Sequence, residues 1–438
     1  MSLDQLHFMN GRVCSCGKTH SFSAQVITGA GVLAQLPEIL SGLSGKKPYI
    51  LCDRNTYAAA GKQVCEILEK AGVSPVLYCF PQESPEPDEH SVGSAVMHMP
   101  AGCDTVIGVG SGVINDIGKI LSALSGKSYI IVATAPSMDG YASATSSMTR
   151  SGLKISLPSR GADVILGDSD ILCQAPMKLL RSGLGDMLAK YISICEWRVA
   201  HLLLGEYFCE EIADLVRSAV NQCVAHAEGL LNRDKDAVMA VFDGLIIGGV
   251  AMNYAGLSRP ASGVEHYISH VLDMQAVEFG EKAELHGLQC AVGTYIAAKA
   301  YEKLYALTPD REKALFKVAA FSYDTHAALL REFFGKGADS MIALEAREKK
   351  YDPVAHRDRL EDILAHWSRI LAIAREEIPT AETLDALYDT VGLPKTLEEI
   401  GANTKLLPTI LRCTKDIRDK YVLSRLAWDL GEEETLFD

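Results

Sequence analysis

The sequence predicts an α/β domain followed by an all-helical domain, and three observations lead to this prediction. Short apolar runs alternate with amphipathic segments over the first 175 residues. From Pro176 onward, the apolar residues recur almost everywhere at helical spacing. A glycine-rich stretch at 108–119 directly follows one of the apolar runs. Because alternating strands and helices are typical of a parallel sheet covered by helices, we expect one domain at 1–175 and a second at 176–438.

The individual elements of this prediction follow from local patterns. A proline near the start of a helix places the domain boundary at about 173–178. The segment 154–168 holds two strand-like runs around a Pro-Ser-Arg-Gly turn, which predicts a β-hairpin. The most charged segment, 337–362, predicts a solvated helix pair to which we assign no chemistry. Buried strands are expected at 48–53, 75–80, 105–110 and 129–136.

Composition excludes several classes of function. The 438 residues are 48% hydrophobic and 22% charged, as in a soluble globular protein, and no run approaches the roughly 20 apolar residues of a membrane span. The N-terminus lacks the pattern of a signal peptide, and twelve scattered cysteines indicate reduced thiols, so we expect a cytoplasmic protein. A net charge of −14 argues against nucleic acid and anionic membranes as partners. A phosphorylated substrate stays compatible, because a few local cations suffice for one phosphate.

The glycine-rich stretch GVGSGVINDIGK at 108–119 has the features of a phosphate-binding loop. Gly110 and Gly112 permit close backbone approach, and the helix that begins near Val113 points N–H groups and its positive dipole end at an anion. Its spacing is G-x-G-x-G rather than the dinucleotide fingerprint G-x-G-x-x-G. A tight strand-to-helix turn without a ligand is the alternative interpretation.

Two further segments are compatible with a nucleotide. Asp53 closes an expected strand, where an acidic side chain commonly binds an adenine ribose. An aspartate in this position is also a common helix cap. The loop TAPSMDGYAS at 134–143 is dense in small hydroxyl residues and could line phosphates or a nicotinamide, although an ordinary capped turn has the same composition.

Four separated residues form the principal candidate metal site. They are Asp186, His266, His270 and His286, and two imidazoles with one carboxylate suit a divalent cation while leaving positions open for substrate. His266 and His270 stand four apart on one helix face, a pattern that more often marks two partly buried histidines than a metal site. The surrounding Ser, Pro and Gly residues are poor core fillers and favour the metal. For Asp186, a carboxylate that stabilises a helix N-terminus is the alternative.

A second cluster with metal-ligand chemistry lies near the N-terminus. Cys14, Cys16 and His20 occur in CSCGKTH, which offers only three ligands at an unusual spacing. We therefore favour the tip of a β-hairpin for this segment, with a structural zinc site as the alternative.

Several motifs together resemble a known family. GVGSGVINDIGK, TAPSMDGYASATSSM, SGLGDMLAKY, SRPASGVEHYISH and ELHG resemble, in order and spacing, the sn-glycerol-1-phosphate dehydrogenases. That family belongs to the superfamily of glycerol dehydrogenase, iron-containing alcohol dehydrogenases and dehydroquinate synthase. The resemblance extends to about residue 300, and the PSMDG and SRPASG-EH segments point to the bacterial branch. It implies a nucleotide-binding α/β domain, a helical domain and an active site in the cleft between them.

The resemblance also implies roles for particular residues. His270 and Asp139 would touch the substrate, and Asp53 would bind the adenine ribose. The metal ligands would be Asp186, His266 and His286. The nicotinamide cofactor would contact Gly110, Gly112, Val113, Ile114, Asn115, Asp116, Thr134, Ser137 and Ser143.

The implied activity is the interconversion of dihydroxyacetone phosphate and sn-glycerol 1-phosphate by hydride transfer. The metal would polarise the carbonyl, His270 would relay a proton and Asp139 would hold a hydroxyl. The substrate phosphate needs cations, for which Arg259, Lys190 and Arg418 are candidates; each could instead be a surface or ion-pair residue.

Cofactor identity and competing activities stay open at this point. Asp53 disfavours the 2′-phosphate of NADP and Arg54 offsets this in part, so NAD or NADP is expected together with one divalent ion, zinc, nickel or iron. A glycerol or polyol dehydrogenase is one alternative, and a dehydroquinate synthase-like cyclase is another. We expect a homo-oligomer with a small phosphorylated substrate and no nucleic-acid or membrane partner.

Overall fold

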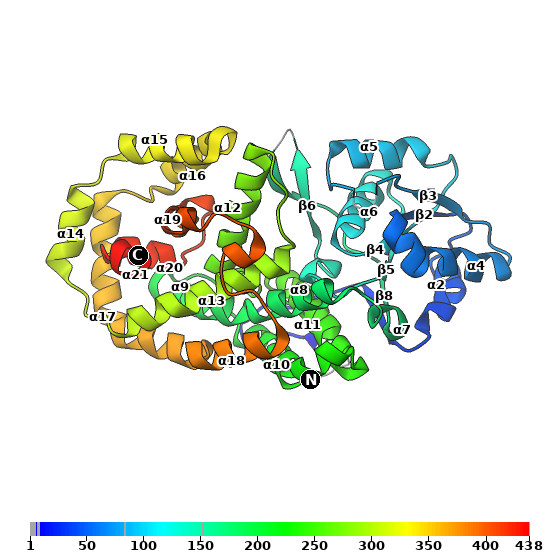
Figure 1. Cartoon of the computed structure of the whole chain (residues 1–438), viewed down its shortest axis with the longest axis horizontal. Helices are drawn as coiled ribbons and strands as arrows, with labels where there is room; N and C mark the ends of the chain where they lie inside the picture. Colours follow the sequence, from blue (N-terminus) through cyan, green and yellow to red (C-terminus); the bar gives the residue numbers. More distant parts are fainter. Residues whose placement is uncertain (1–5, 7–8, 83–84, 151–152, 438) are drawn as a thin grey trace. The chain divides into compact units, whose positions relative to one another are not determined.

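The chain folds into two compact units in the computed structural model, which describes residues 6, 9–82, 85–150 and 153–437 (Figure 1). The first unit comprises 1–187 and 214–257, and the second comprises 188–213 and 258–438. The first unit thus extends beyond the expected 1–175 domain by two segments. The assignment of nucleotide binding to 1–175, and of metal and substrate binding to 176–438, stays a prediction.

A six-stranded sheet forms the centre of the first unit. Its order is β1-β8-β5-β4-β2-β3, and every pairing is parallel. Strands β2, β4 and β8 are buried along their whole length, which explains their continuous apolar sequences, because helices cover both faces of a parallel sheet. The strands are β1 (Gln25–Gly29), β2 (Pro48–Cys52), β3 (Val76–Cys79), β4 (Thr105–Gly110), β5 (Ser128–Ala133) and β8 (Val164–Asp168). The predicted α/β fold with a parallel sheet is confirmed.

The prediction of a β-hairpin at 154–168 is wrong. The two runs form separate strands: β7 (Leu153–Pro158) pairs antiparallel with β6 (Thr145–Arg150), whereas β8 enters the main sheet between β5 and β1. The physical reason is burial. The apolar β8 is covered on both faces, while the residues of β7 with described burial are partly or fully exposed.

Helices surround this sheet, and one of them is long and apolar. Helix α11 (Lys235–Ala255) could cross a membrane by length and composition, but 72% of its most apolar window is buried inside the structure. It packs against η3 (Asp139–Tyr141), η4 (Ala227–Asn232) and α7 (Ser169–Leu172), as a core helix does. The other helices are α2 (Leu36–Gly42), α3 (Arg54–Thr56), α4 (Lys62–Lys70), α5 (Glu89–His98), α6 (Gly112–Ser125), α8 (Met177–Leu188) and α10 (Glu210–Ala225).

The second unit is built from helices throughout its described residues, as predicted. Helix α12 packs against α13 and α19, and α9 packs against α17. Two of its members, α16 and α17, lie in the charged segment 337–362 where two helices were expected, but Glu345, Lys350 and His356 of this segment are buried rather than solvated. The helices are α9 (Lys190–Leu204), α12 (Val264–Phe279), α13 (His286–Tyr305), α14 (Arg311–Ala319), α15 (Tyr323–Phe334), α16 (Ala338–Glu348), α17 (Pro353–Glu377), α18 (Ala381–Val391), α19 (Leu407–Ile417), α20 (Leu423–Asp429) and α21 (Glu433–Phe437).

A buried ionic cluster links three helices of the second unit. His326 of α15 places Nε2 at 3.2 Å from Asp416 of α19 and at 3.7 Å from Glu345 of α16. The Tyr351 hydroxyl lies 3.1 Å from the same nitrogen and also binds Asp416. Burial alone would lower the pKa of His326, but its bonds to Asp416 and Glu345 raise it from 6.5 to about 9. The imidazolium therefore compensates two buried carboxylates.

We predict that His326→Gln removes a pH-dependent part of the stability. Because the folded protein binds this proton more tightly than the unfolded chain, the contribution is complete below pH 6.5 and is lost as the pH rises towards 9. The difference in unfolding free energy between wild type and variant should shrink by roughly 2 kcal/mol between about pH 6 and pH 9.5, measured by urea denaturation. His366→Gln, on an exposed part of α17, is the matched control. A difference that does not change with pH would contradict this account.

Candidate functional site

Three predicted cofactor segments meet at one edge of the parallel sheet. Strands β2, β4 and β5 are neighbours, so Asp53, Gly110 and Thr134 follow the carboxyl ends of adjacent strands. The Thr134 N–H donates to the Gly110 carbonyl at 3.1 Å. After β3 the chain crosses to the other side of β2 to form β4, and ligands of open α/β sheets bind where the strand order reverses in this way.

The glycine-rich loop requires a glycine at Gly110. A Cβ placed there would lie 2.6 Å from Cβ of Ile114, so the first turn of α6 folds directly over the end of β4. Helix α6 begins at Gly112, close to the expected start at Val113. The first N–H groups of a helix have no acceptor within it, and they favour an anion. The backbone of the loop therefore fits a phosphate group.

Asp53 is a helix cap in this structure. Its carboxylate accepts from the Thr56 N–H at 2.8 Å, and the Thr56 hydroxyl oxygen accepts from the Asp53 N–H at 2.9 Å. Burial raises the pKa of Asp53, while these hydrogen bonds favour the ionised form. The alternative interpretation of Asp53 as a helix cap is therefore confirmed. The role of Asp53 towards a ribose stays a prediction.

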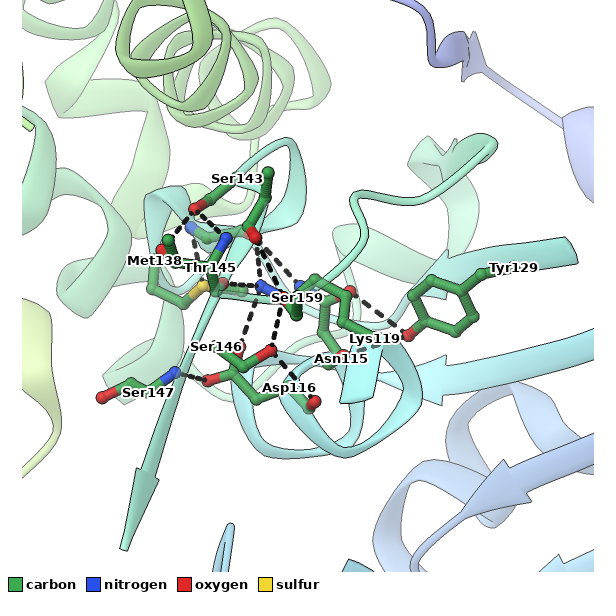
Figure 2. Close-up of polar contacts among 12 residues, drawn as sticks. Asn115, Asp116, Lys119, Tyr129, Met138, Ser143, Thr145, Ser146, Ser147 and Ser159 are labelled. Atoms are coloured by element: carbon green, nitrogen blue, oxygen red, sulfur yellow. Dashed lines mark hydrogen bonds and ion pairs between the residues drawn. The ribbon is translucent and has the colours of Figure 1, made fainter. Parts of the chain in front are cut away.

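Two other predicted cofactor residues turn their side chains into hydrogen bonds within the unit (Figure 2). Asn115 is fully buried and donates to the Gly140 carbonyl at 3.0 Å. Asp116 forms a 2.9 Å ion pair with Lys119 and accepts from the Ser147 N–H at 3.2 Å. The backbone N–H of Asn115 is also bound, since it donates to the Ser111 carbonyl at 2.9 Å. The cofactor contacts predicted for Asn115 and Asp116 stay a prediction.

The loop at 134–143 is fixed by its hydroxyl groups. The Tyr141 hydroxyl donates to the Ala135 carbonyl at 2.6 Å, and the Ser137 hydroxyl contacts that of Ser111 in the glycine-rich loop. The hydroxyl of Ser143 lies 2.9 Å from that of Thr145. The structure therefore joins Ser137 to the glycine-rich loop, whereas Ser143 bonds towards β6.

Asp186 is anchored to this same loop. Helix α8 packs so closely on it that a Cβ on Gly183 would lie 1.9 Å from the Pro136 carbonyl oxygen. One helical turn onward, the fully buried Asp186 carboxylate accepts from the Asp139 N–H at 2.9 Å. Burying a carboxylate is costly without strong partners, so this position is chemically unusual for a helix interior. The structure thus brings Asp139 and Asp186 together.

The second unit brings His266 and His286 together. Their ring centroids are 5.1 Å apart, and one ligand atom from each lies within 4.8 Å of the other and of the Cys290 sulfur. His266 lies in the first turn of α12, and His286 is the first residue of α13. His270, one turn after His266, has its ring centroid 6.4 Å from that of His286.

Internal hydrogen bonds fix the tautomer of both rings. The His266 Nδ1 lies 2.8 Å from the buried Glu265 carboxylate, which can only accept, so Nδ1 donates. The His286 Nδ1 lies 3.0 Å from the Ser269 hydroxyl, which itself donates to the Gln289 carbonyl oxygen at 2.6 Å. The Gln289 amide in turn donates to Asp273 at 3.2 Å.

This directional chain leaves the Ser269 oxygen as acceptor and the His286 Nδ1 as donor. In a neutral imidazole with a proton on Nδ1, the lone pair is on Nε2. Both His266 and His286 therefore present an unprotonated Nε2. A carboxylate or hydroxyl that orients the other ring nitrogen in this way accompanies most metal-binding histidines.

Cys290 is a member of this cluster that sequence reasoning missed. Its sulfur lies 3.6 Å from the His286 Nε2. Burial would raise the pKa of this thiol, but hydrogen bonds from His266 and His286, and the positive charge of either ring when it is protonated, lower it below its usual value. The signal was present in the sequence, because Cys290 follows His286 by four residues and so lies on the same helix face.

Carboxylates of two helices, α9 and α12 itself, hold the start of α12. Glu196 of α9 accepts from the Val264 N–H at 2.8 Å, and Glu265 accepts from the Gly263 N–H at 2.7 Å. Negative charge at a helix N-terminus is stabilising. Burial raises the pKa of Glu196 to about 8, with the neighbouring Glu265 adding to the shift. These contacts explain the unusual SRPASG composition, because its backbone is bound on several sides.

The three candidate phosphate cations have different surroundings. Arg259 is buried, donates to the Tyr421 carbonyl and forms a 2.7 Å ion pair with Glu206. Lys190 is buried and donates to the Ala261 carbonyl at 3.1 Å. Arg418 is exposed at the end of α19.

A lysine that was not predicted accompanies Arg418. Burial lowers the pKa of Lys420 to about 7, and the charges of Arg259 and Arg418 contribute. Burial also lowers the pKa of His270, and the charges of Arg418 and Lys420 add to that effect. Lys420 and Arg418 therefore act electrostatically on the imidazole of His270.

Comparison with known proteins defines first the class and then the family. Residues 27–176 match the family described as iron-containing alcohol dehydrogenase. A glycerol-1-phosphate dehydrogenase of Halalkalibacterium halodurans, named for NAD(P)+, is 33% identical over 295 residues, which cover 66% of this chain and 74% of that protein. One from Geobacillus stearothermophilus is 29% identical over 406 residues, covering 92% and 91%. The chain belongs to the glycerol-1-phosphate dehydrogenase family.

Solved structures agree with this fold. The glycerol dehydrogenase of Schizosaccharomyces pombe matches with a TM-score of 0.64 at 16% identity, covering 96% of this chain and 91% of that one. At this identity the likeness concerns the fold alone.

We predict that Ser269→Ala weakens metal binding 10- to 100-fold, because the hydroxyl that orients the His286 ring is lost. Competition with a chromophoric chelator measures the affinity. Ser424→Ala is the matched control, since it removes a buried hydroxyl bonded to Thr414. Equal affinities for wild type and Ser269→Ala would show that this hydroxyl does not position a ligand.

Proposed function

We propose that the chain interconverts dihydroxyacetone phosphate and sn-glycerol 1-phosphate, using NAD or NADP and one divalent metal ion. Membership in the glycerol-1-phosphate dehydrogenase family supports the reaction. The observation that carries the proposal is the common orientation of His266 and His286, whose Nδ1 atoms are both bound internally. Two imidazoles held in this way are oriented to bind a cation through Nε2.

Asp186, His266 and His286 would hold the metal. The donor set of two neutral nitrogens and one carboxylate fits zinc, nickel or iron, and the Cys290 thiol beside the rings adds a soft donor. When bound, such a cation polarises a carbonyl and stabilises the developing negative oxygen. Glu265 and Ser269 are the positioning residues, because they fix the two rings.

The nucleotide would lie at the carboxyl edge of the parallel sheet. The first turn of α6, with Gly112, Val113 and Ile114, would bind phosphate oxygens through backbone N–H groups. Asn115, whose N–H donates to the Ser111 carbonyl, and Asp116 would line the site beside this turn. Asp53 would reach the adenine ribose and Thr134, Ser137 and Ser143 the nicotinamide half. The nicotinamide supplies the hydride when bound.

His270 and Asp139 would serve the substrate. His270 is a neutral imidazole in these surroundings, so it carries one proton and one lone pair and can pass a proton to the product oxygen. Asp139 would accept a hydrogen bond from a substrate hydroxyl. Arg418 and Lys420 would hold the phosphate, and an arriving anion would favour the charged form of Lys420.

We propose a cytoplasmic setting, which the composition and the cysteines support. None of the twelve cysteines, all of which are described, is in a disulfide, and this fits a reducing compartment. We further propose that the chain assembles as a homo-oligomer.

NADH oxidation by metal-reconstituted protein tests this function. Dihydroxyacetone phosphate should be reduced rapidly, whereas free dihydroxyacetone should be a poor substrate, because it offers nothing to Arg418 and Lys420. Chiral analysis should identify the product as the sn-1 enantiomer. Preference for the free ketone would indicate a polyol dehydrogenase. Failure to oxidise NADH with either ketone would favour the cyclase alternative.

Substitution of the proposed ligands should separate metal binding from proton transfer. Asp186→Ala, His266→Ala and His286→Ala should each lose the metal and lower kcat/KM at least about 100-fold, since several kcal/mol of charge stabilisation disappears. His270→Ala should lower kcat by roughly 10²–10⁴ while keeping the metal. Elemental analysis and steady-state kinetics provide both readouts. Full metal content and activity in His266→Ala would exclude this ligand set.

A further inference from the structure

The N-terminal hairpin carries a second group of metal-ligand side chains, outside the site described above. Residues Val13 and Thr19 pair as an antiparallel bridge, and the Cys14 N–H donates to the Lys18 carbonyl at 2.9 Å. The predicted hairpin tip is therefore confirmed. This turn brings Cys14, Cys16 and His20 together, with one ligand atom of each within 4.8 Å of the others. We propose that these three residues bind a second metal ion, zinc.

Distances within the hairpin fit a shared ion. The Cys16 sulfur lies 3.5 Å from the His20 Nε2. For zinc bonded to sulfur at about 2.3 Å and to nitrogen at about 2.0 Å with a tetrahedral angle, the two ligand atoms would be about 3.5 Å apart. The pair therefore already has the spacing of two ligands of one zinc ion.

The ring of His20 is oriented as that of a metal ligand. Its Nδ1 lies 2.8 Å from the Tyr254 backbone carbonyl, which can only accept, so Nδ1 carries the proton and Nε2 has the lone pair. This is the same arrangement that His266 and His286 show. His20 is 1% exposed and Cys14 is 5% exposed, so the ion would be shielded from solvent. A backbone carbonyl on the second nitrogen is a usual partner of a zinc-bound histidine.

The location gives such an ion a structural role. In the described part of 9–24, the single bridge between Val13 and Thr19 is the only strand pairing, so regular structure contributes little to its order. Tyr254 at the end of α11 makes two hydrogen bonds to the N-terminal part of the chain. Its carbonyl accepts from His20, and its hydroxyl donates to the Leu6 carbonyl. Two thiolates and one imidazole are a borderline-soft donor set that selects zinc over magnesium or calcium. A fourth position stays available for water or a further thiol.

Metal stoichiometry and X-ray absorption test the proposal. Cys14→Ser/Cys16→Ser should lose one equivalent of zinc per chain and retain the metal bound by His266 and His286. The control Cys65→Ser/Cys79→Ser removes two half-buried thiols elsewhere in the first unit and should lose none. Because the test variant could fail to fold, zinc-edge absorption of the intact wild type is measured as well. Sulfur scatterers at about 2.3 Å that disappear in the test variant support the site.

The same measurements can overturn it. Unchanged zinc content in Cys14→Ser/Cys16→Ser, or a wild-type spectrum without sulfur scatterers, would show that the thiols and imidazole are only hydrogen-bonded. Loss of zinc from His266→Ala with the sulfur signal intact would show that the two sites are independent. This outcome separates the hairpin ion from the proposed dehydrogenase activity.

Discussion

The chemistry of the second unit depends on two hydrogen bonds that determine which nitrogen of each histidine carries the proton. Glu265 holds Nδ1 of His266, and the chain from Asp273 through Gln289 and Ser269 holds Nδ1 of His286. Without these acceptors either ring could rotate or change tautomer, and the two proposed metal ligands would no longer be preorganised. Capping of α12 by Glu196 and Glu265 has the same purpose, since it fixes the helix that carries His266.

In the first unit, the main constraint is steric: the connecting loops pack closely against the ends of the strands and against neighbouring helices. Gly110 and Gly183 are two of the positions at which a side chain would collide with a neighbouring segment, and both lie beside loops that we assign to the cofactor or metal. Asp186 is thereby held through its bond to the Asp139 N–H. The hydroxyl groups of Ser137, Tyr141 and Ser143 make hydrogen bonds within the first unit. The proposed phosphate contacts are therefore made by backbone N–H groups at the start of α6.

Sequence patterns predicted the elements whose signal is local. The apolar runs at 48–53 and 105–110, the glycine-rich loop and the helix carrying His266 all depend on neighbouring residues. The hairpin predicted at 154–168 failed because β8 pairs with β5 and β1 of the main sheet, and burial on both faces rather than a local turn determines this pairing. The orienting roles of Glu265 and Ser269 were equally invisible, since they depend on which side chain lies opposite. His20 shows the same limit, because its acceptor Tyr254 is 234 residues away.

Anomalous diffraction at the absorption edge of the bound metal is the most direct test of this account. Crystals of metal-reconstituted protein should show a peak about 2.0–2.1 Å from Nε2 of both His266 and His286, with a carboxylate oxygen of Asp186 as a further ligand. Nδ1 of each ring should keep its hydrogen bond to Glu265 or Ser269. A peak bonded to either Nδ1, or no peak at these rings, would contradict the assignment.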